Sequence, residues 1–258
     1  MDTIDILSSR NLAGLPHGFL GRRGGVSGGI YASLNVGLGS DDDRAAVLEN
    51  RLRATEAVLP GAQLVTLHQV HSANVVTATA PWPDDARPHA DGVVTDRQGL
   101  LLGILTADCV PVLFADIERG IVGAAHAGWK GALSGVTDNV IAAMVAMGAQ
   151  REKIATAIGP CIGRASYEVS DDFAKTFEAA ERANERFFTA GKAGHQYFDI
   201  EAYVIHRLSS AGVGHIDSLG LDTYANSQRF FSYRRTCRAG ESDYGRQISL
   251  IGVNLSTG

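Results

Sequence analysis

Three side chains able to bind a metal ion or act in nucleophilic chemistry interrupt apolar stretches of this sequence: His71, Cys109 and His126. Cys109 ends the polar break TADC inside ILTADCVPVLFAD, whose outer parts are typical of a buried strand, and His126 interrupts the small-residue run AAHAGWKG. Two imidazoles and a thiolate suit Zn²⁺, and three protein ligands with an open fourth position are typical of catalytic zinc. A metal held there would lower the pKa of a water molecule or polarise an oxygen of a substrate.

The spacing of these residues leaves three interpretations open. His71 and Cys109 are 38 residues apart and Cys109 and His126 are 17 apart, which matches no compact metal motif such as HExxH or CxxC. From the pattern alone, a small thiol in the core and two loop histidines are the commoner roles. Cys109 could also be a nucleophile with one histidine as its base. Its neighbour Asp108 could orient a ligand, carry a proton or stabilise a turn.

His68 lies three residues before His71 in the segment TLHQVH. In an extended segment, two residues at this spacing face opposite sides of the chain. We therefore expect one metal ligand from this pair rather than two.

The candidate residues border segments with the pattern of strands, and helices lie between these segments. Helices are expected at about 43–58, 130–147, 170–184 and 199–212, with N-caps from Asp41 to Asp43, Ser170 and Asp199. Strands are expected in LVTLHQVHSANVVTA (64–78, broken at 68–74), ADGVVTD (90–96), GLLLGILTADCVPVLFAD (99–116), GIVGAAHAGW (120–129), KIATAIGP (153–160), FFSYRR (230–235) and RQISLIGV (246–253). This mixture, without strict βα alternation, predicts a mixed-sheet α/β or α+β domain of several layers.

Composition limits the class of protein. The chain has 258 residues, of which 45% are hydrophobic, and no linker is evident, so we expect a single domain over 1–258. Lys and Arg (23) are fewer than Asp and Glu (28), which favours a small-molecule partner over nucleic acid. No apolar run approaches the roughly 18 residues of a membrane span, so we expect no membrane partner.

The cysteines and the N-terminal sequence bear on the compartment. Three widely spaced cysteines argue against a disulfide framework. The sequence MDTID lacks the basic and apolar regions of a signal peptide. We therefore expect a cytoplasmic protein with reduced thiols. No pattern determines the oligomeric state, although a monomer is slightly favoured.

Arginines beside glycine or aromatic residues are candidates for binding an anion. They are Arg22 and Arg23 in GRRGGVSGG, Arg234 and Arg235 in FFSYRR, and Arg246 in YGRQ. Arg23 and the FFSYRR segment are favoured, because flexible glycine backbone lies beside Arg23 and aromatic side chains lie beside the arginines of FFSYRR. Each arginine is more often a surface charge or an ion-pair partner.

The sequence resembles a known family along nearly its whole length. The segments GRRGGVSGGIYASLNVG, TLHQVHSANVV, ADGVVTD, TADCVPVLFAD, AAHAGWKGALSGV, AIGPCIGRASYEV, FFSYRR and GRQ follow one another as in the laccase-domain, multicopper-oxidase-like family. This family is also called the polyphenol oxidase or purine nucleoside phosphorylase family, and it includes the bacterial peptidoglycan editing factor. One departure is Asp222 in LDTYANSQ, at a position where the family often has a cysteine.

The resemblance changes the weight of the three interpretations. It implies that His71, Cys109 and His126 bind zinc in an interior pocket, and with Asp108 they become the catalytic candidates. It implies a multilayered mixed β-sandwich flanked by helices, distantly like cysteine hydrolases of bacterial toxins. The substrate-binding candidates that follow from the matched segments are Arg23, Asn35 and Arg235. Phe230 or Tyr167 could stack a purine, although core packing is the commoner role of each.

The names in this family imply different reactions. A laccase needs several copper ions held largely by His-x-His pairs, whereas this chain has eight histidines and no such pair. A lone His₂Cys copper site would need an axial methionine, and apart from Met1 the only methionines, Met144 and Met147, lie in a predicted helix. Copper is therefore disfavoured.

The resemblance better supports zinc-dependent purine nucleoside chemistry: phosphorolysis of adenosine, inosine and methylthioadenosine to free base and ribose 1-phosphate, and deamination of adenosine. Nucleoside and phosphate would then be the small-molecule partners. The alternative is an amide hydrolase that edits peptidoglycan precursors.

Overall fold

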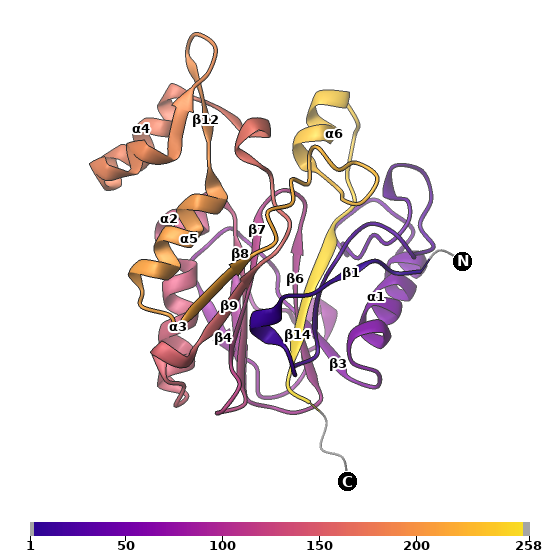
Figure 1. The fold of residues 1–258 in the computed structure, drawn as a ribbon. Helices are drawn as coiled ribbons and strands as arrows, with labels where there is room; N and C mark the ends of the chain where they lie inside the picture. Colours follow the sequence, from indigo (N-terminus) through magenta and orange to yellow (C-terminus); the bar gives the residue numbers. More distant parts are fainter. Residues whose placement is uncertain (1–2, 255–258) are drawn as a thin grey trace.

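The computed structural model describes residues 3–254, and the outermost positions of the predicted domain, 1–2 and 255–258, lie outside the described residues. Two large mixed sheets and one small antiparallel sheet form the framework (Figure 1). The five-stranded sheet has the order β1 (Ile6–Leu7), β2 (His17–Leu20), β14 (Gln247–Gly252), β6 (Leu100–Thr106), β3 (Gln63–Thr66). The six-stranded sheet has the order β13 (His215–Ser218), β9 (Ala155–Ile158), β7 (Val110–Asp116), β8 (Ile121–Ala127), β5 (Gly92–Thr95), β4 (Val75–Thr77). The small sheet has the order β10 (Glu168–Ser170), β12 (His195–Phe198), β11 (Phe188–Ala190).

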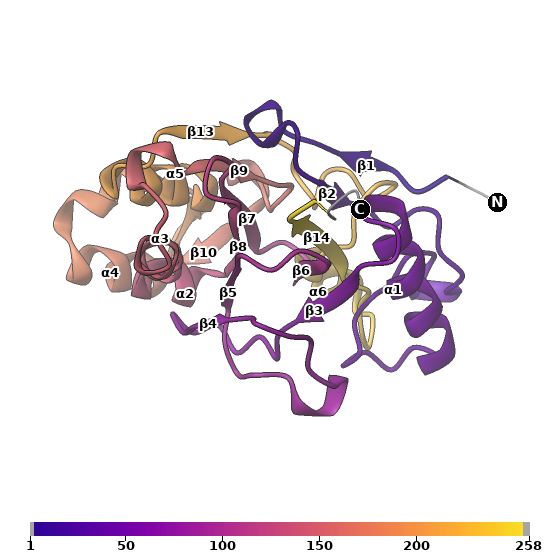
Figure 2. The same cartoon turned by 90° about the horizontal axis from the view of Figure 1, so that it is seen from below.

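Helices cover the outer faces of the two large sheets (Figure 2). The α-helices are α1 (Arg44–Val58), α2 (Trp129–Ser134), α3 (Val136–Ala146), α4 (Asp171–Ala180), α5 (Ile200–Ser210) and α6 (Tyr233–Ala239). Helix α1 packs on the five-stranded sheet, α3 and α5 pack on the six-stranded sheet, and α4 packs on the small sheet. Short 3-10 turns lie at Arg10–Leu12, Gly29–Tyr31, Asp84–Ala86, Arg151–Lys153, Arg164–Ser166 and Arg182–Phe187. The predicted mixed α/β class with several layers is confirmed.

The order of layers follows from the alternation of side chains along the central strands. In β6, Leu100, Leu102 and Ile104 belong to the core between the two sheets, whereas Leu101 belongs to the core beneath α1. Successive strand residues point to opposite faces, and both faces of β6 are covered. The nearly continuous apolar run LLLGIL is therefore buried on both sides.

The predicted caps are confirmed, and two predicted elements are wrong. The side chains of Asp43, Ser170 and Asp199 each accept a hydrogen bond from the first turn of α1, α4 and α5. The helix expected over 130–147 is two helices, because Gly135 between α2 and α3 has a left-handed backbone with φ of 90°. The strand expected at 230–235 is also wrong, since Ser232, in the middle of that segment, is the N-cap of α6.

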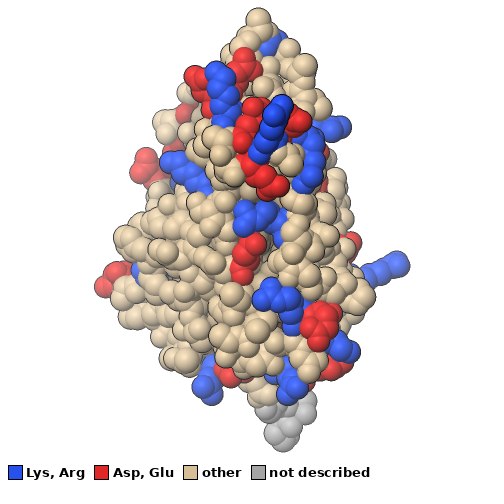
Figure 3. All heavy atoms as spheres, turned by 90° about the vertical axis from the view of Figure 1, so that its left-hand side faces the viewer, with Lys and Arg blue, Asp and Glu red and all other residues tan. Residues whose placement is uncertain are grey.

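Charged residues of both signs are interspersed on the face formed by the α4 and α5 side of the molecule (Figure 3). Among residues 3–254, no helix has the length and apolar character needed to cross a membrane.

The chain passes between the two large sheets at two neighbouring places. Strands β3 and β6, which pair in the five-stranded sheet, are followed by β4 and β7 in the six-stranded sheet. The connecting segments, 67–74 and 107–109, are therefore crossovers between the layers. Gln69 ties the first crossover to the end of β6, just before the second crossover, because its side-chain amide donates to the Leu105 carbonyl (2.7 Å) and accepts from the Leu105 N–H (2.9 Å).

The break between α2 and α3 yields a prediction with a definite sign. In an uninterrupted helix, Gly135→Ala would stabilise the protein by about 0.5–1 kcal/mol, because alanine favours the helix. At the left-handed backbone found here, the same change should destabilise it by about 1–2 kcal/mol, since a Cβ is strained in this conformation. Urea unfolding of both proteins measures the difference, and a more stable variant would contradict the two-helix structure.

Candidate metal centre

Folding brings together the three residues that the sequence separates. His71, Cys109 and His126 each offer a ligand atom, and these atoms all lie within 4.8 Å of one another. His71 lies on the first crossover, Cys109 ends the second crossover, and His126 is the second-to-last residue of strand β8. His126 is buried, Cys109 is half-buried and His71 is exposed, so the centre opens toward solvent on the side of His71.

Asp91 holds the two histidines in place, although its side chain is fully buried. Its Oδ1 lies 2.8 Å from His126 Nδ1 and also accepts the His71 N–H (3.0 Å). Its Oδ2 accepts the N–H (2.6 Å) and hydroxyl (2.8 Å) of Ser72 and the N–H of Val70 (3.2 Å). An ionised carboxylate only accepts hydrogen bonds, so His126 Nδ1 carries the proton and Nε2 is left for a metal.

The pKa values around this carboxylate follow the same arrangement. Burial alone would raise the pKa of Asp91, but the hydrogen bonds from His126 and Ser72 lower it to about 2. Burial would lower the pKa of His126, but its contacts with Cys109 and Asp91 raise it to about 9. The pKa of His71 is lowered because the ring is partly buried and because a positive charge on the nearby His126 would repel its own. The buried Asp91 carboxylate thus favours positive charge on the neighbouring His126 ring.

The backbone of both crossovers is held in an uncommon conformation at the centre. His71 has φ of 58° and Asp108 has φ of 89°, and they are the non-glycine residues with positive φ among residues 3–254. Such conformations cost about 1–3 kcal/mol each and are found mainly where the surrounding structure requires them. Here they direct the His71 and Cys109 side chains toward the same point.

The Asp108 carboxylate binds the segment that leads to α6. It accepts hydrogen bonds from the hydroxyls of Thr223 (2.7 Å) and Ser232 (2.9 Å) and from the N–H of Arg234 (2.6 Å). Burial raises the pKa of Asp108, and these donors oppose the shift. The arrangement makes Asp108 an anchor for the Cys109 crossover.

The residues present fit a zinc ion. Thiolate and imidazole are preferred zinc ligands, and His126 has the carboxylate partner that orients a zinc-binding histidine. Gly128 leaves room for the centre, because a Cβ there would lie 2.5 Å from His71 Nδ1 and 3.2 Å from Cys109 Sγ. Met144, a candidate axial ligand for copper, is fully buried in the core beneath α3.

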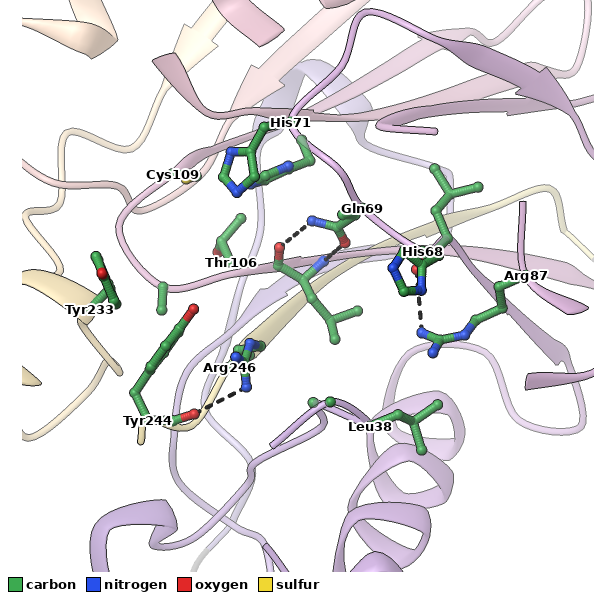
Figure 4. A pocket seen from close by; sticks show the side chains of 16 residues that line it. Leu38, His68, Gln69, His71, Arg87, Thr106, Cys109, Tyr233, Tyr244 and Arg246 are labelled. Carbon is green, nitrogen blue, oxygen red and sulfur yellow. Dashed lines mark hydrogen bonds between the residues drawn. The ribbon is translucent and has the colours of Figure 1, made fainter. Parts of the chain in front are cut away.

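Two pockets meet at the candidate metal centre and share His71, Ala107, Cys109 and Tyr233. The polar pocket, about 500 Å³, is also lined by His68, Gln69, Arg87, Thr106, Tyr244 and Arg246 (Figure 4). The aromatic pocket, about 610 Å³, is also lined by Trp129, Ile162, Tyr167, Phe173, Ile200 and Arg234. A molecule bound at the centre can therefore extend into a polar chamber on one side and an aromatic chamber on the other.

Comparison with known proteins identifies the family. Residues 16–254 match the family described as multi-copper polyphenol oxidoreductase laccase. The chain belongs to this family.

Relatives in this laccase family are named for another activity. The chain is 40% identical over 253 residues to a purine nucleoside phosphorylase of Deinococcus radiodurans, covering 97% of this chain and 93% of the relative. It is 38% identical over 228 residues to a purine nucleoside phosphorylase of Streptomyces coelicolor, covering 88% and 93%.

Solved structures of relatives share the fold. A Neisseria meningitidis protein described as DUF152 has a TM-score of 0.87 at 32% identity, covering 98% of this chain and 99% of that one. YlmD from Geobacillus stearothermophilus has a TM-score of 0.86 at 31% identity, covering 96% and 94%. The mixed α/β architecture is thus the family fold.

The other residues predicted for this laccase-family site lie in different places. Arg23 is exposed, and its Nε donates to the Gln228 carbonyl outside both pockets. Arg235 donates to the carbonyls of residues 223, 224 and 230. Asn35 is buried and binds the backbone N–H groups of residues 37 and 246, which line the polar pocket. Tyr167 lines the aromatic pocket, whereas Phe230 is buried outside both.

Sequence reasoning did not single out Asp91 or Gln69, and it favoured Arg23 and the FFSYRR segment over Arg246. Asp91 lies in the quoted motif ADGVVTD, where an acid directly before an apolar strand was a usable signal. Gln69 lies between two histidines and carries no comparable signal. Arg246 lines the polar pocket, a location that depends on the pairing of β14 with β6.

Asp91→Asn should weaken both the fold and the metal site. The amide keeps the shape but cannot accept every hydrogen bond that the carboxylate accepts, so we expect a loss of about 3 kcal/mol in unfolding free energy. Zinc affinity should fall roughly 10- to 100-fold. Urea unfolding and zinc titration against a competing chelator measure the two effects.

Asp116→Asn is the matched control for this variant. Asp116 is also buried and accepts two backbone N–H groups, but it lies at the end of β7 away from Cys109. It should lower stability without changing zinc affinity. Equal zinc affinities in the two variants would contradict the role given to Asp91.

Gly128→Ala should disturb the centre without removing a ligand. The backbone at Gly128 (φ −67°, ψ 162°) suits alanine, so only the new Cβ, placed against His71 and Cys109, matters. We expect zinc affinity to fall at least about tenfold, because small displacements of ligands weaken a metal site. Gly28→Ala, with no atom within 4 Å of its Cβ, is the control and should bind zinc normally.

Proposed function

We propose that this protein is a zinc-dependent purine nucleoside phosphorylase. It would convert adenosine, inosine and methylthioadenosine to the free base and ribose 1-phosphate, and the same centre would deaminate adenosine. The observation that carries the proposal is the position of the His71, Cys109 and His126 cluster between an aromatic and a polar pocket. The names of the Deinococcus and Streptomyces relatives support the reaction class.

The aromatic pocket is suited to a purine. The Trp129 and Phe173 rings lie 4.9 Å apart, Tyr167 lies 6.1 Å from Phe173, and the Arg234 guanidinium lies over the Tyr167 ring at 5.3 Å. A flat heteroaromatic base stacks favourably on such rings, and its edge nitrogens can meet the arginine. The volume lies in the range of small-molecule sites.

The polar pocket is suited to the ribose and the attacking phosphate. Arg87 and Arg246 bring positive charge, and Gln69, Thr106 and Tyr244 bring hydrogen-bonding groups. Arginine recognises phosphate oxygens through paired N–H donors. The reacting C1′ would then lie beside the cluster, where the two pockets meet.

The cluster would hold zinc through the Cys109 sulfur and one nitrogen of each histidine. Bound there, zinc would serve as a Lewis acid that polarises a substrate oxygen or lowers the pKa of a water molecule. Asp91 would keep His126 in the tautomer that leaves Nε2 for the metal. Asp108 would hold the Cys109 crossover rather than exchange protons with substrate, because hydroxyl and N–H donors already occupy its carboxylate.

The proposal includes a cytoplasmic location and a monomeric enzyme. Cys109, Cys161 and Cys237 form no disulfide within the described residues, and disulfides are rare in a reducing compartment. Cys109 must also be outside a disulfide to bind zinc, since the metal ligand is the deprotonated sulfur of a cysteine.

Cys109→Ala should remove both zinc and turnover. Wild-type protein purified without added metal should contain about one zinc per chain, and the variant should contain almost none, because two histidines alone bind zinc weakly. Inosine with phosphate should yield hypoxanthine and ribose 1-phosphate only in the wild type. Metal analysis and chromatography of the products provide the readouts.

Cys237→Ser is the matched control, because Cys237 is exposed and lines neither pocket. It should keep full zinc content and activity. Absence of base release by the wild type would overturn the phosphorylase proposal. Full activity of Cys109→Ala without zinc would overturn the zinc requirement.

A further inference from the structure

Arg246 lines the polar pocket from the residue before β14. Its backbone N–H donates to Asn35 Oδ1 (3.0 Å), its Nη1 donates to the Tyr244 carbonyl (3.2 Å), and its guanidinium carbon lies 4.1 Å from the centre of the Tyr244 ring. None of the ion pairs found within 3–254 involves Arg246. The side chain is thus fixed by stacking and by one carbonyl, while most of its donors remain for another acceptor.

Acidic neighbours do not compete strongly for this guanidinium. Asp243 is near enough for the charge of Arg246 to contribute to lowering its pKa. Its Oδ2, however, already accepts the Tyr31 hydroxyl (2.8 Å) and the Asp41 N–H (2.8 Å). Arg246 therefore keeps a positive charge that faces the pocket.

The pairing of β14 with β6 fixes Arg246 beside the metal centre. Gln247 pairs with Thr106 in this antiparallel ladder. Arg246 therefore lies across from the next residue, Ala107, which lines both pockets two positions before Cys109. In Figure 4, Thr106 lies between the Cys109 and His71 end of the pocket and the Arg246 and Tyr244 end.

The Thr106 hydroxyl is an independent sign of a ligand at this place. The residue is only 3% exposed, and its Oγ1 is the buried side-chain polar atom without a hydrogen-bond partner among residues 3–254. An unpaired buried hydroxyl is unfavourable, and native proteins rarely keep one without a use. Thr106 lines the same pocket as Arg246, so an oxyanion there would give the hydroxyl its acceptor.

We infer that Arg246 and the Thr106 hydroxyl form the binding site for the attacking phosphate. This inference rests on the proposed phosphorolysis. A phosphate oxygen forms the new bond to C1′ of the nucleoside, and the C1′–N9 bond breaks with its electron pair going to N9. The proton carried by hydrogen phosphate ends on the base, so the products are ribose 1-phosphate and neutral base.

Arg246→Gln should separate phosphate binding from nucleoside binding. Loss of a charge-assisted hydrogen bond corresponds to at least about a tenfold rise in KM for phosphate. The KM for inosine and the zinc content should change little. Arg182→Gln removes the same charge from an exposed 3-10 turn and is the control. A proportional rise in both KM values, or none in that for phosphate, would overturn the inference.

Thr106→Val is the sharper variant because it keeps the shape of the side chain. It removes an unpaired buried hydroxyl, so the melting temperature should stay the same or rise. The KM for phosphate should nevertheless rise about fivefold, as expected for one lost neutral hydrogen bond. A lower melting temperature with unchanged phosphate KM would show that Thr106 is structural and would overturn its assignment.

Calorimetric titration with inorganic phosphate tests the subsite without turnover. Phosphate binding to the wild type that is lost in Arg246→Gln would support the subsite even if inosine were not cleaved. A failure of the phosphate-site inference can therefore be told apart from a failure of the proposed phosphorylase function. Adenosine 5′-monophosphate is the second ligand in this test. If Arg246→Gln weakened the binding of adenosine 5′-monophosphate but not that of inorganic phosphate, the anion bound there would be part of the substrate. The assignment to free phosphate would then be wrong.

Discussion

The buried carboxylate of Asp91 is the constraint on which the candidate site depends. It accepts the N–H groups of three successive residues of the first crossover and the Nδ1 proton of His126. A charge in this position is stable only because donors surround it, and its low pKa keeps it ionised over the physiological range. One side chain therefore fixes both the backbone carrying His71 and the tautomer of His126.

The two-sheet architecture supplies the rest of the geometry. Crossovers at 67–74 and 107–109 leave the same sheet from paired strands and enter the other, so polar residues can gather between layers that are otherwise apolar. Gln69 and Asp108 tether these crossovers through hydrogen bonds to Leu105 and to the segment before α6. The aromatic and polar pockets meet here because residues of both crossovers, His71, Ala107 and Cys109, line both pockets.

The family description and the names of the relatives point to different chemistry, and the ligand set helps to weigh them. One thiolate and two imidazoles at an opening between pockets suit a redox-inactive Lewis acid, whereas oxidase chemistry needs several copper ions with their own histidines. The candidate methionine ligand, Met144, is packed beneath α3. Nucleoside chemistry therefore fits the site better than phenol oxidation.

The sequence by itself predicted the mixed α/β class and the caps of α1, α4 and α5, and it singled out His71, Cys109 and His126 as candidate ligands, because these depend on local patterning and on a family resemblance. It could not show that Gly135 divides a helix or that Ser232 begins one, since tertiary packing decides between local alternatives of similar energy. Only the tertiary structure decided that Asp91 holds both histidines and that Arg246 lies beside Thr106. Those relations arise from strand pairing between distant segments, and a strand pattern does not specify its partner.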